Sequence, residues 1–476
     1  MSTSSFLWHD YETFGARPRS DRPAQFAAIR TDAELNEIGE PLMLYCQPAP
    51  DFLPDPVACL ITGITPQVCL ERGLPEYQFA AQIEQAFSQP GTIGVGYNTI
   101  RFDDEFTRFL FWRNLIDPYA REWQNNCGRW DLLDVVRTTY ALRPEGIVWP
   151  RNADNKVSFK LEDLARANGL QHDAAHDALS DVRATIALAR LIRQRQPKLF
   201  DFCLALHKKE KVNAEIGLPI KKPFLHVSGM FPVEQACLSV VWPLAPHPQN
   251  KNEVIVWDLR YDPSELNTLD AETIRLRMFT RSDDLPEGVE RLPVKSIHIN
   301  KSPIVIGNLK TLSAARAVEL GLDLASILSH AERAQQCPET GKVWEQVFRR
   351  DTPTAVDVDE DLYGGFVSNN DRRTLNHLRG LSAATLAKAA PDFQDGRLHK
   401  LFFRYRARNF PTTLNELEAA QWQEHRRFRL LEDATNARTV QAYFAQIDAL
   451  SEEASADDEE ILTALYDYAE LIVPSD

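Results

Sequence analysis

The stretch FLWHDYETFG, residues 6–15, combines a strand-like pattern with two acidic residues, Asp10 and Glu12. Side chains at positions i and i+2 of a strand project from the same face, so the two carboxylates could hold one divalent cation between them. Acidic pairs are also common on solvated strand edges, and this pair alone is a weak indication. The residues around it are apolar: Phe6, Leu7, Trp8 and Phe14. Unpaired charge is costly in such surroundings, which favours a metal ion as the partner of the pair.

Two further motifs place acidic residues where the chain enters a helix. In GYNTIRFDDEF, residues 96–106, a strand end leads into a helix whose first turn contains Asp103. In HDALSD, residues 176–181, His176 precedes a helix that would have Asp177 as its N-cap and Asp181 in its first turn. Helix capping would explain Asp103 equally well, and an isolated histidine before a helix is most often a surface residue.

The order of the three motifs resembles that of the DEDDh exonuclease superfamily: D-x-E near the N-terminus, N-x3-F-D roughly a hundred residues later, and H-x4-D before a closing helix. This resemblance implies a ribonuclease H-like α/β domain, with a mixed sheet flanked by helices. It also implies that Asp10, Glu12, Asp103 and Asp181 form an acidic quartet served by His176.

Phosphodiester hydrolysis explains why such a quartet is needed. Two metal ions can activate a water on one side of the phosphate and stabilise the departing 3′-oxygen on the other. Hard oxygen ligands favour two Mg²⁺ ions, with Mn²⁺ as a substitute, over zinc. We expect Asp10 to bridge both ions, Glu12 to complete the first site with the scissile phosphate, Asp181 to hold the first ion and Asp103 to orient the second through water. His176 is the expected general base.

Changes in sequence pattern divide the chain into three predicted domains. Residues 1–197 alternate strand-like and helix-like runs up to Pro197, which predicts the α/β exonuclease domain. Residues 198–351 contain short β-rich runs separated by prolines, which predicts a small β domain with some helix. Residues 352–476 begin with an acidic connector and then turn helical, which predicts a C-terminal helical domain.

Composition bounds the kind of protein. The 476-residue chain has a net charge of −15, so any surface that binds nucleic acid must be a concentrated basic patch. Its seven cysteines include no CxxC pair, which predicts reduced thiols rather than disulfides or a zinc ribbon. We expect neither an export signal nor a membrane span, and we expect a cytoplasmic protein.

Two segments have the composition of a single-strand groove, in which arginines contact phosphates and aromatic rings stack on bases. Residues 101–143 contain seven arginines interleaved with tryptophans and tyrosines, and KLFFRYRARNFP at residues 400–411 forms a second cluster. Solvated arginines and buried aromatics would account for about half of the first set. For the second cluster, we expect Arg404 and Arg408 to contact DNA.

Segments along nearly the whole chain look like those of the bacterial exonuclease I family: HDYETFG, RPAQFAAIRTD, LITGITPQ, RWDLLDV, YALRPEGI, LHVSGMF, HINKSP and FRYRARNFP. The resemblance implies processive 3′→5′ degradation of single-stranded DNA to 5′-mononucleotides, in DNA repair and recombination. It implies that the middle domain is SH3-like and that the helical domain closes over the strand. We expect a monomer.

The same resemblance implies which residues bind substrate and partner. Besides Glu12, the positions that match strand contacts are Arg108, Tyr119, Trp123, Arg137 and Lys160. Lys160 stands where the family often has arginine, so a bidentate phosphate contact becomes a single-point one. Arg143 and Lys222 match a basic pocket for the acidic C-terminal tail of single-stranded-DNA-binding protein.

Two other readings of the sequence are open. An enzyme of the same superfamily acting on short RNA, or as a proofreading subunit, needs little more than the first domain, whereas over half of this chain lies beyond it. A non-catalytic single-strand-binding or scaffold protein has no need of four carboxylates and a histidine together. Digestion of single-stranded DNA, RNA and duplex separates these alternatives.

Overall fold

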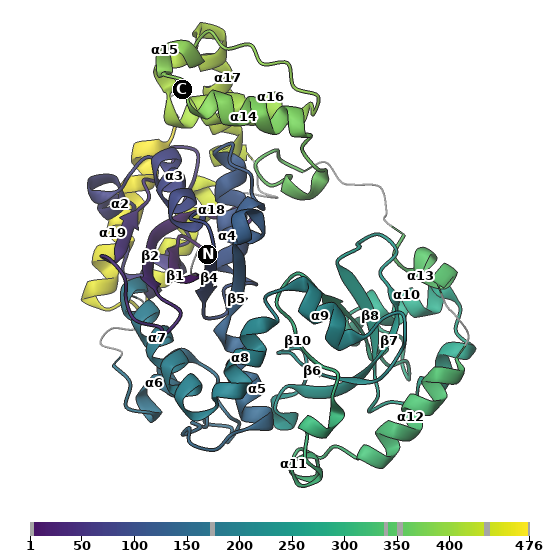
Figure 1. Ribbon diagram of the computed structural model, residues 1–476. Coiled ribbons are helices and arrows are strands. Elements are labelled where there is room, and N and C mark those ends of the chain that lie inside the picture. Colours follow the sequence, from purple (N-terminus) through teal and green to yellow (C-terminus); the bar gives the residue numbers. More distant parts are fainter. Residues whose placement is uncertain (1–3, 172–176, 338–340, 350–355, 433–437, 475–476) are drawn as a thin grey trace. The chain divides into compact units, whose positions relative to one another are not determined.

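The computed structural model describes residues 4–171, 177–337, 341–349, 356–432 and 438–474 (Figure 1). The chain forms two compact units, each assembled from separate segments. The first unit contains Met1–Gly128, His172–Arg183 and Ala355–Asp476, and the second contains Arg129–Gln171 and Ala184–Thr354. The C-terminal helices therefore belong to the same unit as the N-terminal strands.

The sheet that contains the first sequence motif is mixed, as predicted. It has the order β3-β2-β1-β4-β5, and β1 pairs antiparallel with β2 and parallel with β4. The strands are β1 (Ser5–Thr13), β2 (Pro23–Thr31), β3 (Leu42–Tyr45), β4 (Thr92–Gly96) and β5 (Gly128–Asp131). Because β1 is the central strand and both its faces are covered, nearly all of its residues are buried, in agreement with its apolar sequence.

Helices of the first unit come from both ends of the chain. The N-terminal ones are α1 (Pro56–Thr62), α2 (Pro66–Arg72), α3 (Glu76–Phe87), α4 (Asp103–Arg113) and the start of α7 (Ala178–Arg195). The C-terminal ones are α14 (Asn369–Arg379), α15 (Ala383–Leu386), α16 (Arg397–Asn409), α17 (Glu416–Arg427), a π-helical turn (Phe428–Glu432), α18 (Val440–Ser451) and α19 (Ala456–Ile472). Short 3₁₀ turns include Ala120–Glu122, Gln124–Asn126, Leu362–Gly364 and Pro411–Thr413.

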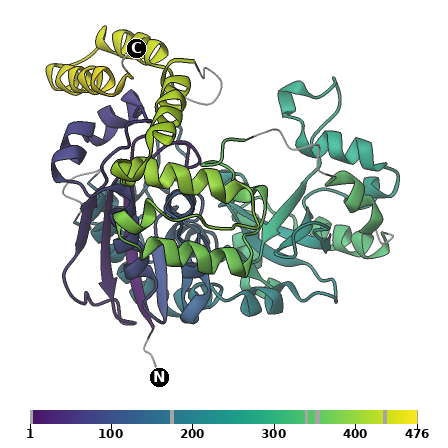
Figure 2. The ribbon, with the colours of Figure 1, turned by 90° about the horizontal axis from the view of Figure 1, so that it is seen from above.

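Two apolar clusters join these N-terminal and C-terminal segments. In one, α18 and α19 pack on α1 and α2, with Tyr443, Leu465 and Tyr468 among the buried residues. Figures 1 and 2 show these purple and yellow segments side by side. In the other, helices α14–α16 pack on α4, where Trp112 is buried and its Nε1 donates a hydrogen bond to the carbonyl of Val358, 2.8 Å away.

The prediction that Arg404 and Arg408 contact DNA is wrong. Both side chains are only 2% exposed and are occupied by carboxylates inside the first unit. Arg404 pairs with Asp357 and Asp359, and Arg408 pairs with Asp359 and with Asp51, at 2.7 Å from the latter. The guanidinium of Arg408 holds the pKa of Asp51 well below its usual range despite burial. This arginine cluster therefore holds chain segments together.

The second unit contains an antiparallel sheet and several helices, as predicted for the β-rich segment. Its strands, in the order β10-β6-β7-β8-β9, are β6 (Phe224–Val227), β7 (Leu238–Pro246), β8 (Glu253–Asp258), β9 (Val294–His298) and β10 (Ile304–Ile306). Its helices are α5 (Leu132–Leu142), α6 (Leu161–Ala167), the remainder of α7, α8 (Pro197–Ala205), α9 (Lys209–Ile216), α10 (Ala271–Phe279), α11 (Ala314–Glu319), α12 (Leu324–Gln336) and α13 (Gly341–Val347).

The prediction of reduced thiols is confirmed within the described residues. All seven cysteines are free thiols, six of them buried. None of the described helices combines the length and apolar character needed to cross a membrane.

Candidate active site

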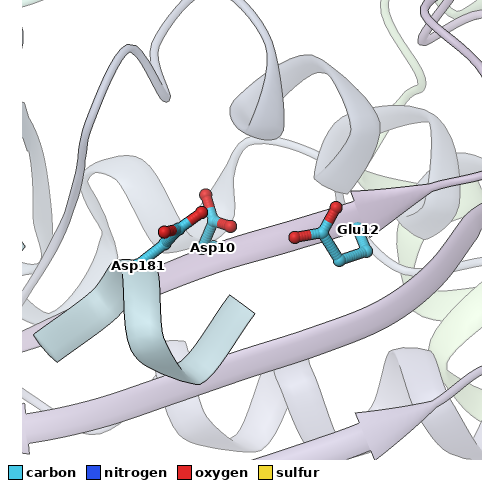
Figure 3. A group of neighbouring side chains, drawn as sticks. All are labelled: Asp10, Glu12 and Asp181. Atoms are coloured by element: carbon cyan, nitrogen blue, oxygen red, sulfur yellow. The ribbon is translucent and has the colours of Figure 1, made fainter. Parts of the chain in front are cut away.

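Three of the predicted metal ligands converge at one point of the first unit. Asp10 and Glu12 project from the same face of β1, and Asp181 approaches them from the first turn of α7 (Figure 3). One carboxylate oxygen from each residue lies within 4.8 Å of the others. Glu12 is buried, at 7% exposure, whereas Asp10 and Asp181 are half-buried. Residues 171 positions apart in sequence thus form one acidic site.

The start of α7 explains how Asp181 is positioned. The Asp177 carboxylate accepts a hydrogen bond from the backbone N–H of Ser180 at 3.0 Å, which is the interaction of an N-capping residue. The cap fixes where the helix begins and leaves Asp181 within the first turn. His176 lies outside the described residues.

Asp103 stands beside the other three carboxylates at the first residue of α4. It is 4% exposed, and its Oδ1 accepts a hydrogen bond from the backbone N–H of Tyr11 at 3.2 Å, between the positions of Asp10 and Glu12. Asp103 reaches β1 because β4, which precedes α4 in the chain, pairs with β1. At Gly96, a Cβ would lie 2.7 Å from the carbonyl oxygen of His9, so only glycine allows this spacing.

Burial and the charges of neighbouring carboxylates raise the pKa values of Asp10 and Glu12. The pKa of Asp10 is raised well above its usual value by removal from water and then by the charges of Asp103 and Asp181. For Glu12, burial and the charges of Asp10, Asp181 and Asp177 raise the pKa to about 9. Carboxylates held together in this way need protons or cations to compensate their charge. The site therefore fits divalent ions bound by hard oxygen ligands.

The predicted strand contacts in the first unit differ in accessibility. Arg108, which is 5% exposed, is held at 2.7–3.0 Å by Glu105 and Glu122, and its guanidinium lies over the ring of Tyr119. Trp123, by contrast, is 64% exposed. The two glutamate partners of Arg108 were not predicted from the sequence, although the i,i+3 spacing of Glu105 and Arg108 on a helix could have indicated one of them.

The predicted contacts in the second unit lie at its surface or near it. Arg137 forms an ion pair with Asp134 at 2.7 Å, and Lys160 is 74% exposed and 3.8 Å from Glu162. Arg143 donates to the carbonyl of Thr311 at 3.1 Å and is exposed, as is Lys222. Their binding roles stay predictions.

Comparison with protein-family models defines the class of protein to which this fold and site belong. Residues 7–189, which contain the four carboxylates, match the model described as Exonuclease. Residues 207–350 match the Exonuclease I SH3-like domain, and residues 356–472 match the Exonuclease I C-terminal domain. The chain belongs to the exonuclease I family and is an exodeoxyribonuclease.

Individual relatives are similar over their whole length. Exodeoxyribonuclease I of Escherichia coli (strain K12) is 46% identical over 474 residues, covering 99% of this chain and 98% of that protein. The crystal structure of E. coli exonuclease I in complex with a dA16 oligonucleotide has a TM-score of 0.94 at 46% identity, covering 99% of this chain and all of the other. A zinc-ion-bound E. coli exonuclease I–single-stranded DNA complex has a TM-score of 0.93 at 45% identity, with the same coverage.

In the absence of divalent cations, the stability of the folded protein should fall as pH rises. The pKa of Glu12 is about 9 in the folded protein and about 4.5 in an unfolded chain, so the folded state keeps a proton that the unfolded state releases. The resulting stabilisation is complete below about pH 4.5 and is lost as pH rises through about 9. We expect the thermal midpoint in EDTA to fall over this range. Added Mn²⁺ should remove most of the fall, because the ion takes the place of the proton.

The control for this titration is Glu12→Gln, which should flatten the decline in EDTA. Identical pH profiles in EDTA for the wild type and Glu12→Gln would contradict the assignment of the raised pKa to this carboxyl.

Proposed function

We propose that the protein degrades single-stranded DNA from its 3′ end, releases 5′-mononucleotides and uses Mg²⁺. The observation that carries the proposal is the convergence of Asp10, Glu12 and Asp181, with Asp103 beside them, in a site where burial and neighbouring charges raise the pKa values of Asp10 and Glu12. Four carboxylates and no sulfur ligand favour Mg²⁺ over zinc under physiological conditions, with Mn²⁺ as a substitute.

The chain supplies ligands, a base and strand contacts to this reaction. Asp10, Glu12, Asp103 and Asp181 would hold two divalent ions, which supply an activated water and neutralise the charge on the departing 3′-oxygen. The hydrogen bond from the Tyr11 backbone keeps the Asp103 carboxylate directed at β1. His176 accepts the proton of the attacking water. The exposed ring of Trp123 offers a surface on which a base can stack.

Digestion of end-labelled strands tests the activity and its direction. With Mg²⁺, we expect release of 5′-mononucleotides from the 3′ end of single-stranded DNA, and much slower release from RNA and duplex of equal length. Asp10→Ala should lower the rate by more than about 10²-fold, beyond the usual loss for an outer-shell partner of a metal site. The exposed Asp392→Ala is the matched control. Full activity of Asp10→Ala would overturn the proposal.

His176→Ala should slow the reaction by roughly 10²–10⁴-fold, the usual contribution of a positioned general base, while the ions still bind. Single-turnover rates measure the loss of activity, and the rise in thermal midpoint on adding Mn²⁺ measures whether the ions still bind. An unchanged rate would remove His176 from the mechanism, and a lost metal response would show that it acts through the metal site instead.

We also infer that digestion is processive and serves DNA repair and recombination in the cytoplasm. A further proposal concerns a partner: Arg143 and Lys222 bind the acidic C-terminal tail of single-stranded-DNA-binding protein. Both side chains are exposed on the second unit, where cations can meet carboxylates. Lys222→Glu should weaken binding of a peptide with that tail's sequence in a fluorescence titration, whereas the exposed Lys251→Glu should not. Equal affinities of the wild type, Lys222→Glu and Lys251→Glu for the peptide would exclude Lys222 from the binding site of the tail.

A further inference from the structure

Tyr11 separates the two carboxylates of β1, and its side chain points to the other face of the sheet. Successive residues of a strand project to opposite faces, which explains this direction. The ring is 4% exposed and packs in an apolar cluster that includes Leu110 and Phe111 of α4. Its centroid lies 4.8 Å from that of Phe26. The residue between the two carboxylates is thus fixed in the core beneath the active site.

The phenol of Tyr11 meets a second hydroxyl in this core, that of Thr107. The two oxygens form a hydrogen bond of 3.0 Å, and Thr107 is fully buried. The Thr107 hydroxyl also donates to the backbone carbonyl of Asp103 at 2.9 Å, one helical turn earlier. A hydroxyl has one hydrogen and two lone pairs, so it can donate to this carbonyl while it accepts from the phenol. The two hydroxyls therefore connect the side chain of Tyr11 to the backbone of Asp103.

Tyr11 contacts the first residue of α4 in two ways. Its backbone N–H donates to the Asp103 carboxylate at 3.2 Å, and its phenol reaches the Asp103 carbonyl through Thr107. The hydrogen bond to the carboxylate is at the long end of the usual range for N–H···O, so by itself it constrains the carboxylate weakly. The connection through Thr107 holds the backbone from which this carboxylate projects.

The next residue of α4, Asp104, has buried contacts of its own. It is 1% exposed, and its carboxylate forms an ion pair with the buried Arg121. Its backbone N–H donates to the carbonyl of Thr99 at 2.9 Å. These contacts fix the start of α4 relative to the segment that follows β4. The contacts of Tyr11 fix it relative to β1, the strand that carries two of the carboxylates.

We propose that Tyr11 is a positioning residue of the metal site: its phenol, acting through Thr107, sets where the Asp103 carboxylate lies relative to the two carboxylates of β1. This inference rests on the proposed function, because it concerns the ions that these carboxylates would hold. Loss of an outer-shell partner that orients a metal ligand typically costs about 10- to 100-fold in metal affinity or activity. Because the phenol faces the core, it acts on the metal ligand and not on the DNA strand.

Tyr11→Phe tests the inference, because it removes the phenol oxygen and keeps the ring. We expect the Mg²⁺ concentration that gives the half-maximal single-turnover rate to rise by about 10- to 100-fold. Binding of Mn²⁺, followed by its electron paramagnetic resonance signal, should weaken by a similar factor. Affinity for a short single-stranded DNA in EDTA should stay unchanged, since the phenol lies on the opposite face of the sheet from the carboxylates.

Variants of Thr107 test whether the effect passes through its hydroxyl. Thr107→Val removes the hydroxyl and should raise the Mg²⁺ requirement as Tyr11→Phe does. The double variant should lose no more than either single variant, because both substitutions break the same connection. Thr107→Ser keeps a hydroxyl at this position and should keep the wild-type Mg²⁺ requirement.

Tyr443→Phe is the matched control. This tyrosine is also fully buried in the first unit, and its Oη has no hydrogen-bond partner among the described residues, so its loss should leave the Mg²⁺ requirement unchanged. A wild-type Mg²⁺ requirement in Tyr11→Phe overturns the inference, as does an equal rise in Tyr443→Phe or full additivity of Tyr11→Phe and Thr107→Val. Failure of the proposed function is a different result, in which the wild type itself neither binds Mn²⁺ nor digests single strands.

Discussion

The repulsion between carboxylates that the fold forces together is the constraint on which the first unit depends. Asp10 and Glu12 share one face of the central strand, and Asp181 and Asp103 reach the same place from the first turns of two helices. Partial removal from water makes each charge costly, and each neighbouring charge adds to that cost. A site of this kind opposes folding unless cations or protons occupy it, so the surrounding structure must hold it in place.

The C-terminal chain provides much of that support. The segment that leads into α14 accepts a hydrogen bond from Trp112 on α4. Asp357 and Asp359 of the same segment form ion pairs with Arg404. Such buried pairs are costly to break, because each would leave an uncompensated charge. The hydrogen bond from Trp112 attaches this segment to α4, whose first residue is Asp103. The helical segment is thus part of the body that holds the active site.

Local patterns in the sequence identified the parts of the site that local geometry determines. Strand alternation placed Asp10 and Glu12 on one face, and capping rules placed Asp181 in the first turn of its helix. Arg404 and Arg408 were misjudged because their carboxylate partners lie elsewhere in the chain, as far away as Asp51, and the composition of one segment cannot reveal them.

These pairings bear on how a protein with a net charge of −15 can hold a polyanion. In the first unit, Arg108, Arg404 and Arg408 are each held by two carboxylates, so they contribute little net positive potential to a passing phosphate. Counterion release depends on cations that are available to phosphates, whereas stacking of a base on an aromatic ring requires no cation. Among the predicted strand contacts, the accessible ones are of another kind, since Trp123 is 64% exposed and Lys160 is 74% exposed. Every base has a flat face, so stacking on an exposed ring such as that of Trp123 would be independent of base sequence.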